Sequence, residues 1–232
     1  MISVCLATYN GEKYIRQQLE SILSQLSDSD EVIISDDGST DLTLKIIEDF
    51  KDKRIKTFKN NKNHGINGNF ENALNCAAGD FIFLSDQDDV WLPNKVKNCI
   101  SYLKENDCIV HDGYITDENL VIQSNGILNG IKLNGFFRNL CRNNYTGCCM
   151  AFKRNVLKTI LPFPKSKYFY HDQWIGLLCE LKFKVLFIRE KLIYFRRHGE
   201  NTSTVTKKSK RSLFTKIISR FQLFYSLIKR IC

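Results

Sequence analysis

The 232-residue sequence has few of the features that divide a chain into parts. It contains only three prolines, and no Gly/Ser-rich or low-complexity stretch interrupts its first two hundred residues, so we expect no linker and no internal repeat. With 43% hydrophobic residues, the chain is long enough for one domain with a sizeable buried core. We predict a single domain over residues 1–203 and a separate tail over residues 207–232.

The start of the chain lacks the pattern of a secretory signal peptide. Residues 1–7 are apolar, but this run is short, has no basic start and is followed at once by Tyr9, Asn10 and Gly11. The nine cysteines include no Cys-x-x-Cys pair and no paired Cys/His spacing, which favours reduced thiols over a zinc site or a disulfide framework. Both absences predict a cytoplasmic protein.

Negative charge is missing from the end of the chain. Residues 207–232 hold eight Lys and Arg residues and no acidic residue, which leaves about +1 of the formal net charge of +9 for the body. No recognised nucleic-acid-binding motif accompanies this basic tail. We therefore expect no nucleic-acid partner.

Short apolar runs alternate with longer segments of helical period up to about residue 198, which indicates an α/β fold with helices on both faces of a sheet. In residues 1–100, a nucleotide-binding half, we expect strands at 2–7, 31–35, 55–59 and 81–85, and helices at 13–25, 42–51 and 69–78, the last capped by Gly79. In residues 101–203, an acceptor half, we expect helices at 135–142 and 173–181, two strands within 108–123, and strands at 147–153 and 184–196. A further helix, at 95–105, connects the two halves.

Polar clusters follow three of the predicted strands, at the sheet edge where α/β proteins bind ligands. They are Thr8-Tyr9-Asn10-Gly11, then Asp36-Asp37-Gly38-Ser39-Thr40-Asp41, then Asp86-Gln87-Asp88-Asp89. The second cluster is equally compatible with a turn and a helix N-cap. The third is harder to explain structurally, because three carboxylates within four residues repel one another unless a cation or solvent neutralises them. Hard oxygen ligands suit Mg²⁺ or Mn²⁺, whereas the alternative is a solvated acidic loop.

The order and spacing of these clusters, with Gly79-Asp80 leading into the fourth strand, resemble the family 2 glycosyltransferases, and later motifs extend the resemblance to about Ser203. It implies a single GT-A domain, with a central mixed sheet flanked by helices, that binds a nucleotide diphosphate sugar and transfers its hexose with inversion. By the same resemblance Thr8, Tyr9 and Asn10 would border the nucleotide, and Asp36 or Asp37 would accept a hydrogen bond from the base. Asp88 would be the direct ligand of Mn²⁺ or Mg²⁺, and Asp86 would lie beside the metal and the ribose.

Two later motifs complete the resemblance. Asp172 stands at a predicted helix start, where the family has the base that deprotonates the acceptor hydroxyl; the alternative is a helix cap. Arg196 and His198 belong to a stretch similar to the family's Tyr-Arg-x-His motif and would offset the diphosphate charge, with His198 able to reach the metal; the alternative is an exposed basic strand end. Asp112 is a weaker candidate for the acceptor side, with a turn as its alternative, and residues 147–150 are expected to wall the acceptor site.

The resemblance implies an acceptor that is a lipid-linked cell-surface glycan, of O-antigen, capsule or lipooligosaccharide type. UDP-glucose, UDP-galactose and dTDP-rhamnose remain open as donors. The alternative function is a non-catalytic nucleotide-sugar-binding module, which would keep Asp36 and Asp37 but would not need both Asp88 and Asp172.

The tail has the pattern of an amphipathic helix. One apolar stripe is formed by Phe214, Ile217, Ile218, Phe221, Phe224, Tyr225, Ile228 and Ile231, and Lys216, Arg220, Lys229 and Arg230 fall mainly off it. Basic residues interrupt the segment well short of the ~20 apolar residues that span a bilayer. We expect this tail to lie on the anionic inner face of the cell membrane; the alternative is that the stripe packs on the domain or on a partner.

Overall fold

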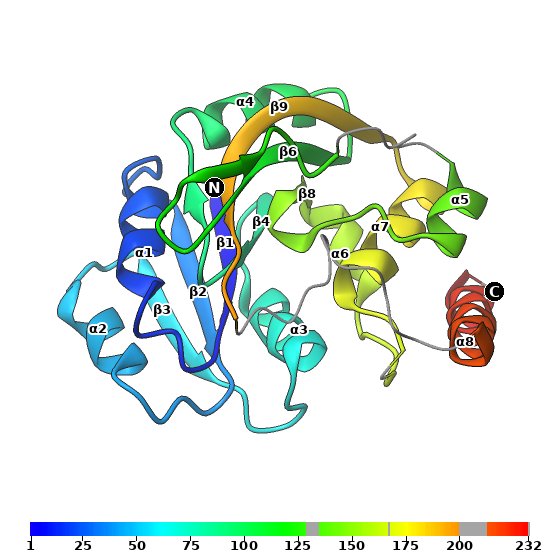
Figure 1. Cartoon of the computed structure of the whole chain (residues 1–232), viewed down its shortest axis with the longest axis horizontal. Helices are drawn as coiled ribbons and strands as arrows, with labels where there is room; N and C mark the ends of the chain where they lie inside the picture. The colour runs from blue at the N-terminus through cyan, green and yellow to red at the C-terminus, as the bar shows by residue number, and fades with distance from the viewer. Residues whose placement is uncertain (129–134, 167, 200–212, 232) are drawn as a thin grey trace.

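The computed structural model describes residues 1–128, 135–166, 168–199 and 213–231 (Figure 1). In these residues the chain builds one mixed sheet, flanked by helices, with the strand order β3-β2-β1-β4-β8-β6-β9-β5 and with β7 paired to β6. Helices α1 and α2 lie at one end of the molecule in Figure 1, and the C-terminal helix α8 lies at the other. The expected mixed sheet flanked by helices is confirmed.

The first half of the chain forms the parallel part of the sheet. Its strands are β1 (Ile2–Thr8), β2 (Glu31–Asp36), β3 (Ile55–Lys59) and β4 (Phe81–Asp86), and its helices are α1 (Ile15–Leu23), α2 (Thr43–Asp49) and α3 (Ile66–Cys76). β1 lies between β2 and β4 and is parallel to both. Because helices cover both faces, β1 and β2 are buried along nearly their whole length, and near-continuous apolar runs located β1, β2 and β4 to within one residue. The largely exposed β3 has no such run, but its predicted bounds are also correct.

The second half adds the antiparallel part. Its strands are β5 (Val90–Trp91), β6 (Cys108–Thr116), β7 (Ile122–Ser124), β8 (Met150–Lys153) and β9 (Val185–Arg196). Its helices are α4 (Lys95–Leu103), α5 (Phe136–Cys141), the short 3-10 helices η1 (Gly147–Cys149) and η2 (Arg154–Val156), α6 (Leu157–Ile160) and α7 (His171–Lys182). β8 is antiparallel to both β4 and β6, so it joins the two halves into one sheet.

Two local predictions are wrong. Gly79 does not cap α3, which ends at Cys76 and is followed by Ala77 in an extended conformation. Gly79 instead packs against β1, where an added Cβ would lie 2.6 Å from the backbone nitrogen of Ser3. Residues 147–149 form η1 and not the start of a strand, because the chain turns there before β8 begins at Met150.

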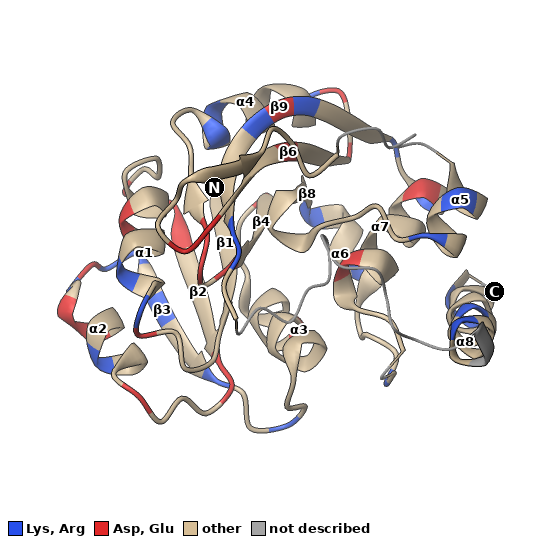
Figure 2. Ribbon diagram, viewed as in Figure 1, with Lys and Arg blue, Asp and Glu red and all other residues tan. Residues whose placement is uncertain are grey.

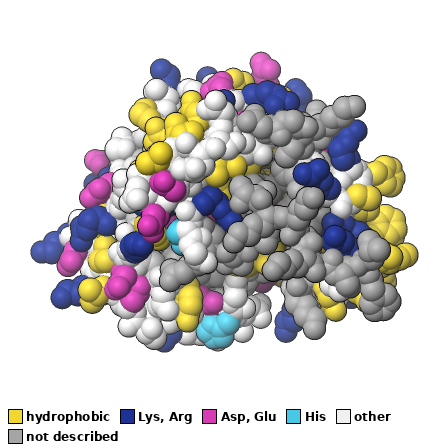
Figure 3. Space-filling model, viewed as in Figure 1, with side chains coloured by type: hydrophobic (Ala, Val, Ile, Leu, Met, Phe, Trp, Pro, Cys, Tyr) yellow, Lys and Arg dark blue, Asp and Glu magenta, His cyan; other side chains and the backbone are white. Residues whose placement is uncertain are grey.

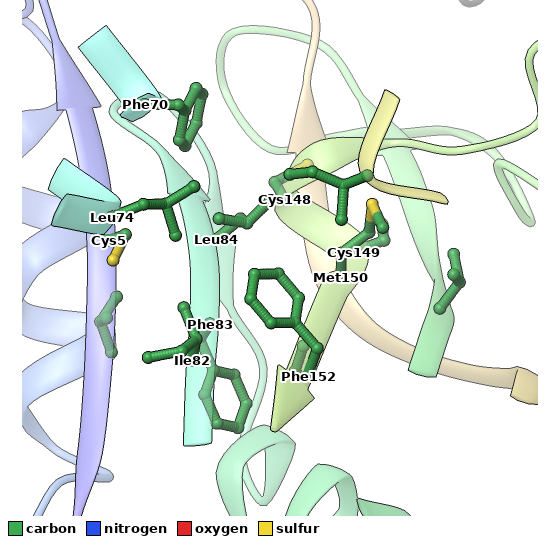
Figure 4. Packing of buried hydrophobic residues seen from close by; sticks show 14 of the residues in the cluster. Cys5, Phe70, Leu74, Ile82, Phe83, Leu84, Cys148, Cys149, Met150 and Phe152 are labelled. Carbon is green, nitrogen blue, oxygen red and sulfur yellow. The ribbon is translucent and has the colours of Figure 1, made fainter. Parts of the chain in front are cut away.

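The core covers both faces of the central strands and includes side chains of α1, α3, α4 and α7; Figure 4 shows the part around α3, β4 and β8. Phe83 of β4, Phe152 of β8 and Phe70 of α3 are fully buried there. Truncation of such a phenylalanine to alanine costs about 3–5 kcal/mol of folding free energy. The eight cysteines of the described residues are all free, as expected for reduced thiols.

The helix α8 (Leu213–Ile231) packs on the domain through a face that the sequence analysis did not identify. Its buried side chains are Ser219, Leu223 and Leu227, four residues apart, whereas Phe221 and Tyr225 of the predicted stripe are exposed. The basic residues at 207–211 and the boundary at Ser203 lie outside the described residues. Among the helices that the structure describes, none is both long and apolar enough to cross a bilayer.

Candidate active site

The register of the parallel strands brings the polar clusters to one edge of the sheet. Thr8 pairs with Asp36 across β1 and β2, and Ala7 pairs with Asp86 across β1 and β4. The loops that follow these strands therefore start side by side, at the carboxyl edge where open α/β sheets bind ligands.

The carboxylates of Asp36 and Asp37 have different hydrogen-bond partners. The buried carboxylate of Asp36 accepts hydrogen bonds from the backbone nitrogens of Gly38 and Ser39, both at 2.9 Å, so it shapes its own turn. Asp37 reaches across to the loop before α3, where its Oδ2 accepts the backbone N–H of Gly65 at 2.7 Å and its Oδ1 lies 3.0 Å from Nδ1 of His64. The turn interpretation thus fits Asp36, and Asp37 is the better placed of the two to face a ligand.

The loop over residues 8–11 is fastened to both acidic loops. Asn10, in a left-handed conformation, donates its backbone N–H to Ser39 Oγ at 2.9 Å. Thr8 is buried and donates its hydroxyl to Oε1 of Gln87 at 2.6 Å, whereas Tyr9 and Asn10 are exposed. Of these three residues, Tyr9 and Asn10 can therefore reach a nucleotide directly.

Gln87 was missed as a functional residue by the sequence analysis. Its Oε1 also accepts the backbone N–H of Tyr9 at 2.8 Å, and its Nε2 donates to the carbonyl of Tyr9 at 3.1 Å. Gly11 leaves room for this side chain, because an added Cβ there would lie 2.4 Å from Gln87 Oε1. Only its position between two acids of the triplet could have drawn attention to it.

The acidic triplet splits into two groups. Asp86 and Asp89 approach Cys148 of η1, with one ligand atom of each residue within 4.8 Å of the others, whereas Asp88 turns to His198, whose Nε2 lies 2.8 Å from its Oδ2. His198 therefore contacts Asp88, the expected metal ligand, and its role at a metal stays a prediction.

Two acids of the triplet, Asp86 and Asp89, have raised pKa values. Burial, followed by the charges of Asp88 and Asp172, raises the pKa of Asp86 to about 7. Burial, followed by repulsion from Asp88 and Asp86, raises the pKa of Asp89 well above its ordinary value. A divalent cation would relieve this repulsion, and the carboxylates of Asp86 and Asp88 are hard oxygen donors of the kind that Mn²⁺ and Mg²⁺ prefer. The residues present therefore fit such a cation.

A buried lysine beneath the triplet was also missed. Lys95, at the start of α4, is buried; its Nζ donates to the carbonyl of Cys148 at 2.8 Å and lies 4.3 Å from the centroid of the Trp91 ring. Its positive charge lowers the pKa of Asp86 and so partly offsets the burial of that carboxyl. Lys95 follows Asp89 closely in the sequence, but no sequence pattern indicated that its side chain turns back to the triplet.

Asp172 lies in the first turn of α7 and faces the triplet from the acceptor half. Its negative charge is close enough to contribute to the raised pKa of Asp86, and Asn143 donates from Nδ2 to its Oδ2 at 3.2 Å. Burial raises the pKa of Asp172 to about 6. Tyr170 occupies the N-cap position, and the Asp172 carboxylate accepts the backbone N–H of Gln173 at 2.6 Å within the first turn. A carboxylate with this pKa is suited to accept a proton near neutral pH.

The preceding residue packs beneath the site. His171 is buried and stacks on Phe70 with ring centroids 3.9 Å apart, and burial lowers its pKa to about 3. Gly147 of η1 passes so close that an added Cβ would lie 2.6 Å from His171 Nε2. Gly147 thus packs against the start of α7, and the expected role of residues 147–150 at the acceptor site stays a prediction.

The structural alternatives considered for Arg196 and Asp112 do not agree with the structure. The guanidinium of Arg196 is largely buried, donating to the side chain of Gln17 and to the carbonyl of Glu118, so it does not form an exposed basic strand end. Both Arg196 and the neighbouring Arg197 interact electrostatically with Asp88 and Asp89. Asp112 lies inside β6 and not at a turn, and its buried carboxylate accepts the backbone N–H groups of residues 113, 127 and 128.

Known proteins share this sequence pattern. Residues 3–161 match the sequence profile described as Glycosyl transferase family 2. An uncharacterized glycosyltransferase of Haemophilus influenzae is 27% identical over all of this chain and 78% of its own length. UDP-Glc:alpha-D-GlcNAc-diphosphoundecaprenol beta-1,3-glucosyltransferase WfgD of Escherichia coli is 30% identical over 77% of this chain and 70% of its own length. Other relatives are longer, and this chain spans 49% of one of them.

Solved structures share the fold. TarS 1–349 of S. aureus in complex with UDP-GlcNAc superposes with a TM-score of 0.69 at 19% identity, over 99% of this chain and 72% of that one. Mannosyltransferase PcManGT from Pyrobaculum calidifontis in complex with GDP-Man and Mn²⁺ gives 0.65 at 19% identity, over 98% and 64%. The GT-A fold expected from the sequence resemblance is confirmed.

Proposed function

This chain belongs to glycosyltransferase family 2, and from that premise we propose that it transfers a hexose from a nucleotide diphosphate sugar to a lipid-linked glycan, with inversion at the anomeric carbon. The observation that carries the proposal is that η1 links the two acids: Cys148 lies within 4.8 Å of Asp86, and Gly147 packs against His171, next to Asp172, whose charge acts on Asp86. A donor bound at the triplet then presents its sugar toward a carboxylate that can take a proton.

The nucleotide would lie over the loops that follow β1 and β2, against Tyr9 and Asn10. Asp37 is the proposed partner of the base N–H, and Asp36 holds the turn beneath it. Thr8 would contribute indirectly, because its hydroxyl donates to Gln87, which in turn holds the backbone of Tyr9. We assign residues 1–100 to donor binding and residues 101–203 to the acceptor.

Asp88, Asp86 and His198 are the residues that would hold Mn²⁺ or Mg²⁺. When bound, such an ion neutralises charge that develops on the departing nucleotide diphosphate. The complex of a structural neighbour with Mn²⁺ supports the choice of cation, as does the raised pKa of Asp86. We assign the screening of diphosphate charge to Arg196, as the motif suggested, together with Arg197, because both interact with Asp88 and Asp89; Arg196 also donates to Gln17 of α1.

Asp172 is the proposed general base. It would take the proton of the acceptor hydroxyl as that oxygen attacks the anomeric carbon from the side opposite the diphosphate, which inverts the linkage. Asn143 would hold the carboxylate in place through its hydrogen bond to Oδ2.

The donor and acceptor classes rest on the relatives. WfgD is named for transfer of glucose from UDP-Glc to a diphosphoundecaprenol-linked sugar, so UDP-glucose is the first donor to test, before UDP-galactose and dTDP-rhamnose. A diphosphate-linked lipid acceptor would place the enzyme at the inner surface of the cell membrane. Residues 207–232 are the proposed contact with that surface.

The experiment is a donor panel in the presence of Mn²⁺ and a diphosphoundecaprenol-linked acceptor, with release of nucleotide diphosphate and the anomeric configuration of the product as readouts. One donor is expected to give acceptor-dependent release and an inverted product. Binding of a donor without any acceptor-dependent release, across the panel, would favour the non-catalytic nucleotide-sugar-binding module.

A further inference from the structure

Two helices at the end of the molecule away from α1 and α2 expose large apolar side chains. Phe137 of α5 is 75% exposed and Phe221 of α8 is 72% exposed. The helices are in contact, since Arg220 Nε donates to the carbonyl of Cys141, at the end of α5, at 3.0 Å. We name as the α5–α8 face the exposed side chains Phe137, Ile217, Phe221, Phe224, Tyr225 and Ile228.

Both helices belong to segments of the chain that contain basic residues and no acidic ones. Residues 119–171 and residues 201–232 contain no acidic residue and hold 16 of the 34 Lys and Arg residues, so the rest of the chain has a formal charge of −7. The fold brings these two segments together: Ser166 Oγ donates to Gln222 Oε1 at 3.5 Å, and the guanidinium of Arg230 donates to the carbonyl of Leu161. Figure 2 shows only basic charges on α5 and α8.

Exposed cations border the apolar side chains. Arg142, just after α5, and Lys229 of α8 are both exposed. Figure 3 shows hydrophobic and basic side chains gathered at the edge where α5 and α8 lie. Aromatic side chains flanked by lysine and arginine are typical of helices that lie in the interface of an anionic membrane.

We propose that the α5–α8 face is a docking surface for an anionic lipid bilayer, formed by both helices and not by the tail alone. A second copy of the chain is a poorer occupant, because it would bring two acid-free segments of like charge together. Anionic headgroups instead neutralise that charge, and the aromatic rings enter the headgroup region. The role that we give to docking depends on the proposed lipid-linked acceptor. Binding to the bilayer does not depend on it.

Docking through α5 would bring the bilayer close to the proposed base. The chain leaves α5 at Cys141, and Asn143, two residues later, donates its hydrogen bond to Asp172. The surface that rests on the membrane and the residue that holds the base are therefore parts of one short segment. This continuity favours a lipid-linked acceptor whose sugar rises only a short distance from the headgroups.

The test is flotation of the full chain with vesicles of phosphatidylcholine, alone or mixed with phosphatidylglycerol. We expect binding to the anionic vesicles, and a fall of the partition coefficient on the order of tenfold for Phe137→Ser and for Phe221→Ser, each of which removes one buried ring from the contact. Leu42→Ser, at a 58% exposed leucine next to α2, is the matched control and should bind like the unaltered protein. Arg142→Gln should weaken binding more than Lys104→Gln, a charge change on the far side of the sheet.

Three results would overturn the proposal. The first is that the intact chain ignores anionic vesicles. The second is that Phe221→Ser weakens binding and Phe137→Ser does not, which would leave α8 alone as the contact. The third is that sedimentation velocity without lipid shows a dimer that Phe221→Ser dissociates. Thermal unfolding checks that each variant is folded. Nucleotide diphosphate release with a detergent-solubilised acceptor separates membrane docking from the proposed transferase activity, because the docking variants should keep this release.

Discussion

The aspartates after β2 and those after β4 occupy equivalent sheet edges but have opposite surroundings. Asp36 and Asp37 each accept hydrogen bonds from backbone N–H groups, so the charge of each carboxylate is used to fold a loop. Asp86 and Asp89 lie against other carboxyls. Asp89 also accepts the backbone N–H of Arg196 at 3.0 Å, but burial with mutual repulsion still raises the pKa of both acids. Acids that are satisfied by backbone donors build the site, and acids that are left to repel one another are available for a cation.

The substitution with the largest expected effect is Asp88→Ala, in the repulsive cluster after β4. We expect it to abolish metal-dependent transfer, because it removes the proposed direct ligand, and to leave the protein folded, because it thins a repulsive cluster. Activity and thermal unfolding are measured together, with Asp28→Ala at an exposed position as the control. Full activity in excess EDTA would remove the metal from the mechanism.

The next test separates the base from the donor site. Asp172→Asn keeps the shape of the side chain but cannot accept the proton, so turnover should fall by about 10²-fold or more while donor affinity is retained. Steady-state kinetics and isothermal titration with the nucleotide diphosphate measure the two quantities. A loss of donor affinity with turnover preserved would show that Asp172 has a structural role only.

A smaller effect is expected in the pH profile. Because burial raises the pKa of Asp172 to about 6, the base is protonated and inactive below that pH, and turnover should rise as the pH increases through about 6. The residual activity of Asp172→Asn should lack this rise. An unchanged acidic limb in the variant would assign the titration to another group.

The smallest expected effects are on the free energy of unfolding, where Asp36, which binds backbone N–H groups of its own turn, is compared with Asp89, which is repelled by other carboxyls. Asp36→Asn should lower the free energy of unfolding by about 0.5–1.5 kcal/mol, because charge-assisted hydrogen bonds to its turn are weakened. Asp89→Asn should raise the stability of the metal-free protein at neutral pH. The sign follows from the raised pKa of Asp89: the metal-free fold gains stability as the pH falls and the carboxyl becomes neutral, and Asn imitates that neutral form. Urea unfolding in EDTA measures both changes, and the same sign for both would contradict the comparison.

Much of the nucleotide half could be predicted because its signals are local. Buried parallel strands read as apolar runs, and their ends place the acidic clusters, so the positions of β1 to β4 and of Asp86 and Asp88 followed from the sequence. Predictions were poorer where the chain turns without a periodic pattern, as at η1, and where a residue packs against a distant one, as Gly79 does against β1.

The order of the motifs, the edge at which the acids lie and the amphipathic character of the tail were determined by the sequence alone, since each depends on periodicity or on the end of a strand. Tertiary structure alone decided which acids repel one another, that Lys95 lies beneath them, that Gln87 fastens two loops, and which face of α8 is buried. The physical reason is that hydrogen bonds, charge interactions and packing depend on distance in space, and residues as far apart as Asp86 and Asp172 come together only when β8 joins the two halves of the sheet.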